Sequence, residues 1–168
     1  MIEKTLIIIK PDGVKRGLIG EIIRRYEQGG LNVVALKMLT APKQLVARHY
    51  PAGEDYVISL GKKSERGGTV VTDYRKQGLA VLSWLRAFIS SGPVVPMVLE
   101  GEGAIQKARD ITGYTDPAEA AKGTIRGDFG QDSIKKANSE SRPVHNLIHA
   151  SGNPDEARKE IAIWFPKR

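Results

Sequence analysis

The stretch VHNLIHASGN, residues 144–153, indicates how the C-terminal part of this chain folds. Residues 146–149 predict a short β-strand that ends on His149, and small residues follow it. A helix is predicted next, because Asn153 suits an N-cap and Pro154 suits the first helical position. We therefore expect His149 at the end of a rigid strand, with little side-chain bulk beyond it.

An imidazole in this place has more than one interpretation. It can take up and pass on a chemical group near neutral pH, as nucleophilic catalysis requires. It can also be a packed or solvated side chain, which is the commoner state of a lone histidine. A third interpretation pairs His149 with His145, on the same strand face, as a metal site, but the sequence offers no evident third ligand.

The rest of the chain alternates strand and helix patterns. Leu6–Ile9 is a continuous apolar run, typical of a central strand covered on both faces. The proline at position 96 suggests that its strand lies at an edge or carries a bulge. The patterns predict further strands at 31–39 and 94–99, and helices at 18–28, 42–50, 79–89, 103–112 and 154–164.

Three segments depart from this regularity. Residues 51–78 contain repeated glycine and proline, and predict a long excursion with at most a short helix or hairpin. Residues 123–130, GTIRGDFG, predict a glycine-rich loop whose backbone can approach a ligand. A short Ala-rich helix is expected just before this loop, and the polar residues 131–143 predict a loop or partial disorder.

The order of these elements predicts an α+β protein. It fits a ferredoxin-like split βαβ sandwich, a four-stranded antiparallel sheet with helices packed on one face. A doubly wound parallel sheet is the alternative, and it is less favoured because only four strands are found. The length of 168 residues suits one domain, so we expect residues 1–168 to form a single unit.

Composition narrows the possible functions. The chain has no cysteine, which excludes disulfides and thiolate metal sites. It shows no signal-peptide pattern and no apolar stretch of membrane-spanning length, so we expect a cytoplasmic protein with no membrane partner. The net charge of +7 suits a polyanion such as nucleic acid or phosphorylated metabolites. The basic residues are scattered, however, and only 6% of residues are aromatic, too few for a stacking platform.

Dispersed cations are the residues that could accompany the histidine in phosphate chemistry. No P-loop sequence is present. Lys10, Arg109 and Arg126 each lie at a strand end, on a helix or in a loop, and could converge on one rim. Phosphoryl transfer needs little more than positioning and charge neutralisation. Each cation alone is also an ordinary surface residue, so their convergence is a prediction.

Several sequence blocks resemble the nucleoside diphosphate kinase family. They occur in the family's order and span nearly the whole chain, which makes the set far more specific than any one of them. The blocks are IKPDGV (9–14), RGLIGEII (16–23), HY (49–50), SGPVV (91–95), EG (100–101), GTIRGDF (123–129), NLIHAS (146–151) and EIAIWF (160–165).

The resemblance implies that a nucleoside triphosphate gives its γ-phosphoryl group to a histidine, from which a nucleoside diphosphate takes it. His149 matches the phosphorylated histidine, which in the family attacks through Nδ1. Glu160 matches the glutamate that helps orient this ring, and Ser151 the serine beside it. Mg²⁺ would be held mainly through the nucleotide phosphates, so no metal ligand from the chain is expected. The matches to residues that hold phosphates and sugar are Lys10, Tyr50, Arg109, Thr115, Arg126 and Asn146.

This sequence also departs from the family pattern. The family usually has a phenylalanine that stacks on the base, and counting back from Ser91 places Val81 there. Aliphatic contact can replace the stacking, with a loss of about 0.5–1.5 kcal/mol in the free energy of the contact with the base. Segments 51–78 and 131–143 look like insertions relative to short family members, and Gly152 stands where an aspartate is common.

The resemblance also suggests a homo-oligomer, in which dimers assemble into tetramers or hexamers. The alternative function is a binding module whose basic surface engages nucleic acid, with weak or lost catalysis. Steep salt dependence of DNA binding, without competition by nucleotides, would favour that alternative. A degenerate structural relative is a third possibility. The presence of His149, Lys10, Arg109 and Arg126 favours the enzyme.

Overall fold

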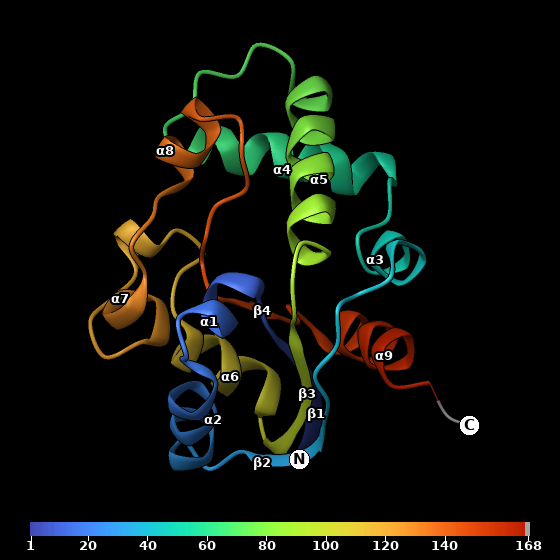
Figure 1. Cartoon of the computed structure of the whole chain (residues 1–168), viewed down its shortest axis with the longest axis vertical. Helices are drawn as coiled ribbons and strands as arrows, with labels where there is room; N and C mark the ends of the chain where they lie inside the picture. The colour runs from blue at the N-terminus through green and yellow to red at the C-terminus, as the bar shows by residue number, and fades with distance from the viewer. Residues whose placement is uncertain (167–168) are drawn as a thin grey trace.

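The computed structural model describes residues 1–166 of the chain (Figure 1). Strands β1 to β4 span Ile2–Ile9, Asn32–Leu36, Val95–Glu102 and Ile148–Ala150. Helices α1 to α9 span Pro11–Lys15, Ile19–Gln28, Lys43–His49, Glu54–Arg66, Tyr74–Ile89, Ala104–Thr112, Ile125–Phe129, Ile134–Ser139 and Pro154–Trp164, and a 3₁₀ helix, η1, spans Pro117–Glu119.

The strands form one antiparallel sheet in the order β2-β3-β1-β4. β1 pairs with β3 along its whole length, and on its other side Ile8 lies opposite His149 of β4. The predicted four-stranded antiparallel α+β fold is confirmed, and the parallel alternative is excluded. The pairing of β1 with β4 brings the first and last strands of the chain together.

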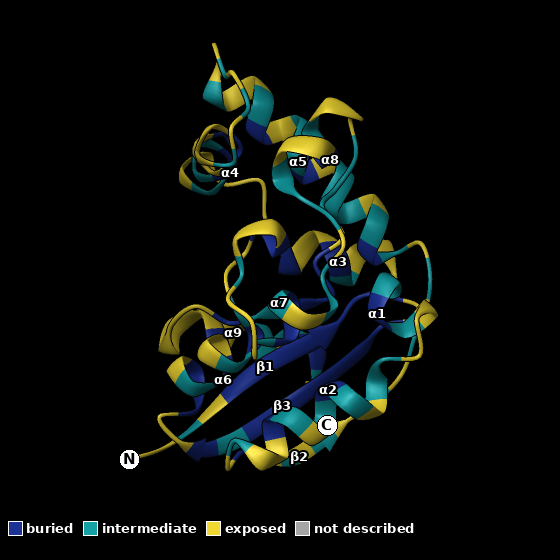
Figure 2. Cartoon of the chain, turned by 90° about the vertical axis from the view of Figure 1, so that its left-hand side faces the viewer, coloured by how far each residue is buried: buried dark blue, intermediate teal, exposed yellow. Residues whose placement is uncertain are grey.

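Helices cover both faces of the sheet. Ile7 and Ile9 belong to a hydrophobic cluster with α2, α6 and α7, whereas Leu6 and Ile8 belong to another with α3, α4, α5 and α9. Side chains alternate between faces along a strand, so these clusters lie on opposite sides of β1. Figure 2 shows β1 and β3 as buried ribbons among the helices. The prediction of a strand covered on both faces is confirmed, and the expectation of helices on one face only was wrong.

The strand that contains Pro96 is not an edge strand, because β3 lies between β2 and β1. The Pro96 carbonyl accepts a hydrogen bond from the Lys37 amide, so the proline nitrogen also faces this side, just past the end of β2 at Leu36. No strand residue there needs a donor from position 96, which explains how a central strand tolerates proline. The irregularity lies on β2, between Val33 and Ala35.

The segment 51–78 is mostly helical, contrary to the expectation of a largely irregular excursion. It contains all of α4 and the start of α5, and these helices pack closely at glycines. A Cβ added to Gly61 would lie 2.2 Å from the Tyr74 carbonyl oxygen, and one added to Gly78 would lie 1.9 Å from that of Val57. These glycines allow the two backbones to approach each other and do not break the helices.

Helices also replace two predicted loops. Residues 123–130 contain α7 and residues 131–143 contain α8. The side chains of Thr124 and Ser133 cap these helices, each accepting a hydrogen bond from the backbone three residues on. The Ala-rich helix expected before α7 is only the 3₁₀ turn η1.

The last helix, α9, has the predicted bounds. Asn153 caps it by accepting a hydrogen bond from the Glu156 amide at 2.9 Å. Within residues 1–166, no helix combines the length and the apolar character needed to cross a membrane.

Candidate active site

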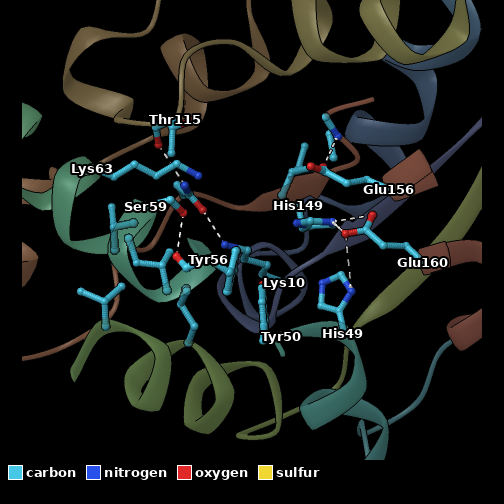
Figure 3. A pocket seen from close by; sticks show the side chains of 18 of the residues that line it. Lys10, His49, Tyr50, Tyr56, Ser59, Lys63, Thr115, His149, Glu156 and Glu160 are labelled. Atoms are coloured by element: carbon cyan, nitrogen blue, oxygen red, sulfur yellow. Dashed lines mark hydrogen bonds and ion pairs between the residues drawn. The ribbon is translucent and has the colours of Figure 1, made fainter. Parts of the chain in front are cut away.

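A cavity of about 1000 Å³ lies between the sheet and the helices α4 and α5 (Figure 3). Most of the site residues expected from sequence line it. Ser151 does not line it, but lies buried behind Glu160. The expected residues that line the cavity are Lys10, Tyr50, Val81, Arg109, Thr115, Arg126, Asn146, His149 and Glu160.

Two hydrogen bonds orient the His149 ring. Its Nε2 lies 2.9 and 3.0 Å from the two carboxylate oxygens of Glu160, one of which also accepts from the Ser151 hydroxyl at 2.5 Å. A carboxylate can only accept, so Nε2 carries the proton and Nδ1 holds the lone pair. Nδ1 has no hydrogen-bond partner among the described residues. The ring therefore offers an unprotonated nitrogen to the cavity.

Glu160 is ionised at neutral pH. Burial raises the pKa of its carboxyl, but electrostatic attraction and a hydrogen bond from the His149 ring, together with His49 and the Ser151 hydroxyl, lower the pKa more, so that it lies below its usual value. An ionised carboxylate at Nε2 stabilises positive charge on the ring as Nδ1 forms a new bond.

The turn into β4 has an unusual backbone. Leu147 has φ of 69°, in the left-handed region that L-residues rarely adopt. Its carbonyl accepts from the Lys10 amide at 2.8 Å, and its own amide donates to the Asp12 carboxylate at 3.0 Å. These bonds hold the strained turn and tie the entrance of β4 to the end of β1.

His49, at the end of α3, packs against this arrangement. Its ring centroid lies 4.5 Å from that of His149, and its Nδ1 lies 3.8 Å from Glu160. Burial lowers the pKa of His49 to about 3, with the charge of His149 adding to the effect, so the ring is neutral. Sequence comparison matched His49 in the HY block but assigned it no role.

Donor atoms of His49, His149 and Glu160 lie within 4.8 Å of one another, which is a possible metal-binding group by residue type. Both oxygens of Glu160 already accept hydrogen bonds, so we interpret this group as support for the His149 ring. His145 does not belong to it. It precedes β4 and stacks on Phe88 with ring centroids 4.7 Å apart, so the interpretation of His145 and His149 as a metal pair is not supported.

Two buried cations face the cavity without a carboxylate bonded to them. Lys10 Nζ donates to the Asn146 side-chain oxygen at 2.8 Å. The Arg126 guanidinium donates to the backbone carbonyls of Asn146, Gly113 and Ile148 at 3.0, 3.0 and 2.5 Å. Burial lowers the pKa of Lys10 to about 8, with a contribution from Arg126, and lowers that of Arg126 to about 10. The site therefore carries positive charge that the protein does not neutralise.

Asn146 connects several of these groups, because its amide nitrogen also donates to the Thr115 carbonyl at 2.9 Å. Arg109 reaches the cavity from the end of α6. A Cβ added to Gly152 would lie 3.6 Å from Arg109 Nη1 and 2.8 Å from the Glu156 carboxylate. Glycine at this position therefore leaves room for Arg109 and Glu156.

Part of the opposite wall comes from the segment 51–78, which was expected to be irregular. We call Lys10, Arg126, Asn146 and His149 the sheet wall. The helical wall consists of Tyr56, Ser59 and Lys63 of α4 with Val81 and Leu85 of α5. The α4 residues were missed because the glycines around them suggested breaks in structure. A polar–apolar period of 3.6 over residues 54–66 was the available signal.

Comparison with known proteins identifies the family. A family model described as nucleoside diphosphate kinase matches residues 3–78 and 74–168. The chain belongs to the nucleoside diphosphate kinase family. A curated nucleoside diphosphate kinase of Pyrobaculum aerophilum is 43% identical, and the alignment covers 98% of this chain and 95% of that protein. One from Borreliella burgdorferi is 42% identical, with 98% and 88% covered.

Solved structures of the nucleoside diphosphate kinase family agree in fold. The crystal structure of an NDP kinase from Pyrobaculum aerophilum superposes with a TM-score of 0.93 at 41% identity, covering 99% of this chain and 97% of that one. A transition-state mimic of the enzyme from Borrelia burgdorferi, with bound vanadate and ADP, gives a TM-score of 0.84 at 40% identity, covering 99% and 88%. The resemblance found in the sequence and the predicted fold are confirmed.

Proposed function

We propose that this protein acts as a nucleoside diphosphate kinase and that His149 carries the phosphoryl group between nucleotides. The observation that carries the proposal is the state of the His149 ring. Glu160 holds its Nε2–H, and Nδ1 faces a cavity lined by Lys10, Arg109 and Arg126. A nucleophile, an orienting base and unneutralised positive charge are the parts that phosphoryl transfer needs.

In the first half-reaction, the Nδ1 lone pair attacks the γ-phosphorus of a nucleoside triphosphate. A P–N bond forms, and the bond from the γ-phosphorus to the bridging oxygen breaks. The electron pair leaves with the nucleoside diphosphate, and the Nε2 proton stays on the ring beside Glu160. The second half-reaction is the reverse: the terminal oxygen of an acceptor diphosphate attacks the same phosphorus and the imidazole leaves.

The cations supply most of the expected stabilisation. Charge spreads over the oxygens of the phosphoryl group while it moves between oxygen and nitrogen. Lys10 and Arg126 are already fixed by hydrogen bonds to the protein, so they need little reorganisation when the nucleotide binds. Tyr50, Thr115 and Asn146 line the same side and would hold phosphate or sugar, and Val81 would face the base.

Mg²⁺ fits this site as a companion of the nucleotide. Glu156 and Glu160 are the only acidic residues among the described lining residues, and both already accept hydrogen bonds. A metal that is bound mainly by phosphate oxygens and keeps several waters suits this scarcity of ligands. Glu156, at the rim, would accept from such a water. When bound, Mg²⁺ would reduce the negative charge that His149 must approach.

We also propose that residues 1–168 form one domain, with insertions at 51–78 and 131–143. We further propose that the protein is cytoplasmic and forms a homo-oligomer built from dimers. The free edge of β2 supports assembly, because Val34, Leu36 and Met38 expose 45%, 47% and 56% of their surface on or just beyond this strand. Light scattering on the purified protein would give the number of subunits. The proposed nucleotide substrates of the protein support a cytoplasmic location.

Incubation with γ-labelled ATP tests the proposed function. We expect an acid-labile, base-stable phosphoenzyme that unlabelled diphosphate discharges. His149→Ala should abolish the label, and His145→Ala is the matched control because this exposed ring lies four residues away and outside the cavity. Label that persists in His149→Ala would show that another residue carries the group.

A further inference from the structure

A lysine on the helical wall lies where the nucleotide would bind. Figure 3 shows Lys63 reaching from α4 into the cavity, on the side where Thr115 lies. Lys63 also lines a smaller hollow of about 260 Å³, and it shares both spaces with Arg109 and Thr115. These residues therefore stand at the junction of the two spaces.

The Lys63 ammonium lacks an anion. No carboxylate lies within ion-pair distance of it among the described residues, and no hydrogen bond occupies its Nζ. Glu156 is the acid whose charge acts on it most, but Glu156 already accepts from the Gly152 amide and the Asn153 side chain. Arg66 and Arg109 add repulsion. Asp116 and Glu119 also line the smaller hollow, but neither forms an ion pair with Lys63 among the described residues.

The surroundings of Lys63 intensify this effect. Lys63 is exposed, and the protein around it still lowers the pKa of its ammonium through partial desolvation. A partly desolvated charge binds an anion more strongly than a charge in open water. Lys62, the preceding residue on α4, is also exposed, but it lines neither space.

α4 is a rigid support for this lysine. The close contact of Gly61 with the Tyr74 backbone lies two residues from Lys63, and Ser64 beside it is buried. On the far side, a Cβ added to Gly67 would lie 2.4 Å from Ile134 of α8. The helix is thus fixed by α5 on one side and α8 on the other, so the backbone of Lys63 has a fixed place beside the cavity.

We propose that Lys63 binds the phosphate chain of the nucleotide, as an additional cation that α4 contributes from across the cavity. The inference rests on the proposed function, because it assigns Lys63 to the nucleotide of that same site. It extends the phosphate site beyond Lys10, Arg109 and Arg126, which all come from other parts of the chain. The ligand chemistry is a di- or triphosphate, and lysine meets it as a point charge that needs no fixed geometry.

Calorimetric titration of the full-length protein with ADP tests the assignment. Lys63→Met should weaken ADP binding by roughly ten-fold, the size expected for loss of one charge-assisted contact. Lys63→Arg should recover most of the affinity, and Lys62→Met should change nothing. The affinity for adenosine, which has no phosphate, should be equal in wild type and Lys63→Met. Raising the salt concentration should reduce the difference in ADP affinity between wild type and Lys63→Met.

The readouts separate this inference from the proposed function. Equal ADP affinity in Lys63→Met and Lys62→Met would overturn the role of Lys63, and so would an equal loss of ADP and adenosine binding. Labelling of His149 by γ-labelled ATP does not depend on that result. If wild type forms a phosphoenzyme while Lys63→Met binds ADP normally, the proposed function stands and this inference fails. Lys63→Gln provides a second uncharged variant if Lys63→Met folds poorly.

Discussion

The two walls of the cavity are built in different ways. On the sheet wall, hydrogen bonds fix the cations: Lys10 donates to the Asn146 side chain, and Arg126 donates to three backbone carbonyls. On the helical wall, close helix packing at Gly61 and Gly78 sets the position of the side chains that reach the cavity. The sheet wall is specified by individual polar contacts, whereas the helical wall is specified by the shape of two backbones.

The largest effect is expected from removing the buried guanidinium of the sheet wall. Arg126→Met would remove the hydrogen bonds to the carbonyls of Asn146, Gly113 and Ile148, of which the Asn146 carbonyl still accepts from the Ile148 amide. An unsatisfied buried group costs about 1–3 kcal/mol, so we expect the free energy of unfolding to fall by about 2–4 kcal/mol after partial relaxation. Phosphotransfer should fall at least ten-fold as well. Urea denaturation and steady-state kinetics would measure the two losses, and a loss of activity alone would show that other bonds position the wall.

Glu160→Gln tests how the sheet wall orients its nucleophile. The amide replaces one of the two accepting oxygens by a donating nitrogen, so at most one of the two contacts of Glu160 with the His149 Nε2–H remains. If the amide donates to Nε2, the ring proton moves to Nδ1 and the nucleophile is lost. We expect kcat to fall by roughly 10–100-fold, as for other partners of a functional histidine, with little change in KM. An unchanged kcat would mean that the carboxylate is not needed to set the tautomer.

The stability of the helical wall should depend on the volume of the residue at position 61. Gly61→Ala adds a methyl group that would meet the Tyr74 backbone, so we expect a loss of about 1–3 kcal/mol in stability. Gly20→Ala is the matched control, because this helical glycine has nothing within 4 Å of its added Cβ. There the change should stabilise the protein, by up to about 1 kcal/mol. Thermal unfolding of both variants makes the comparison, and equal shifts would show that α4 and α5 can separate without cost.

The smallest expected effect is a pH dependence of nucleotide binding. Burial lowers the pKa of Lys10 to about 8, so its ammonium loses charge as the pH rises through this value. KM for the nucleotide should therefore rise several-fold between pH 7 and pH 9. The folded protein should nevertheless become more stable as the pH rises through this range. Above pH 8 the unfolded chain binds more protons at Lys10 than the folded one. The free energy of unfolding therefore increases with pH, up to the ordinary lysine pKa of 10.5. Lys10→Met should show neither trend.

The sequence predicted the sheet wall much better than the helical wall. The apolar run Leu6–Ile9 and the cap at Asn153 are short-range patterns, and the structure has the strand and the helix start that they predicted. The resemblance then named site residues that no sequence pattern could bring together. Lys10 and Asn146, for example, are hydrogen-bonded but lie 136 positions apart. Their convergence depends on the pairing of β1 with β4.

The errors arose where a residue's effect depends on a distant neighbour. Gly61 and Gly78 suggested breaks in the chain, although their function is to let α4 and α5 touch. Pro96 suggested an edge strand, although its nitrogen faces the end of β2. In α7, the glycines on either side of Arg126 obscured the N-cap at Thr124. Sequence pattern alone does not tell a glycine that permits contact from one that ends an element.

The strained turn at Leu147 has a bearing on how the protein is made. Its carbonyl and amide bond to Lys10 and Asp12, which leave the ribosome long before residue 147 does. The phosphate-binding lysine and the acceptor imidazole cannot come together until the final strand has been synthesised and threaded beside the first. A nascent or prematurely terminated chain can therefore hold most of its secondary structure and still lack a reaction centre, and contacts of such long range are slow to form.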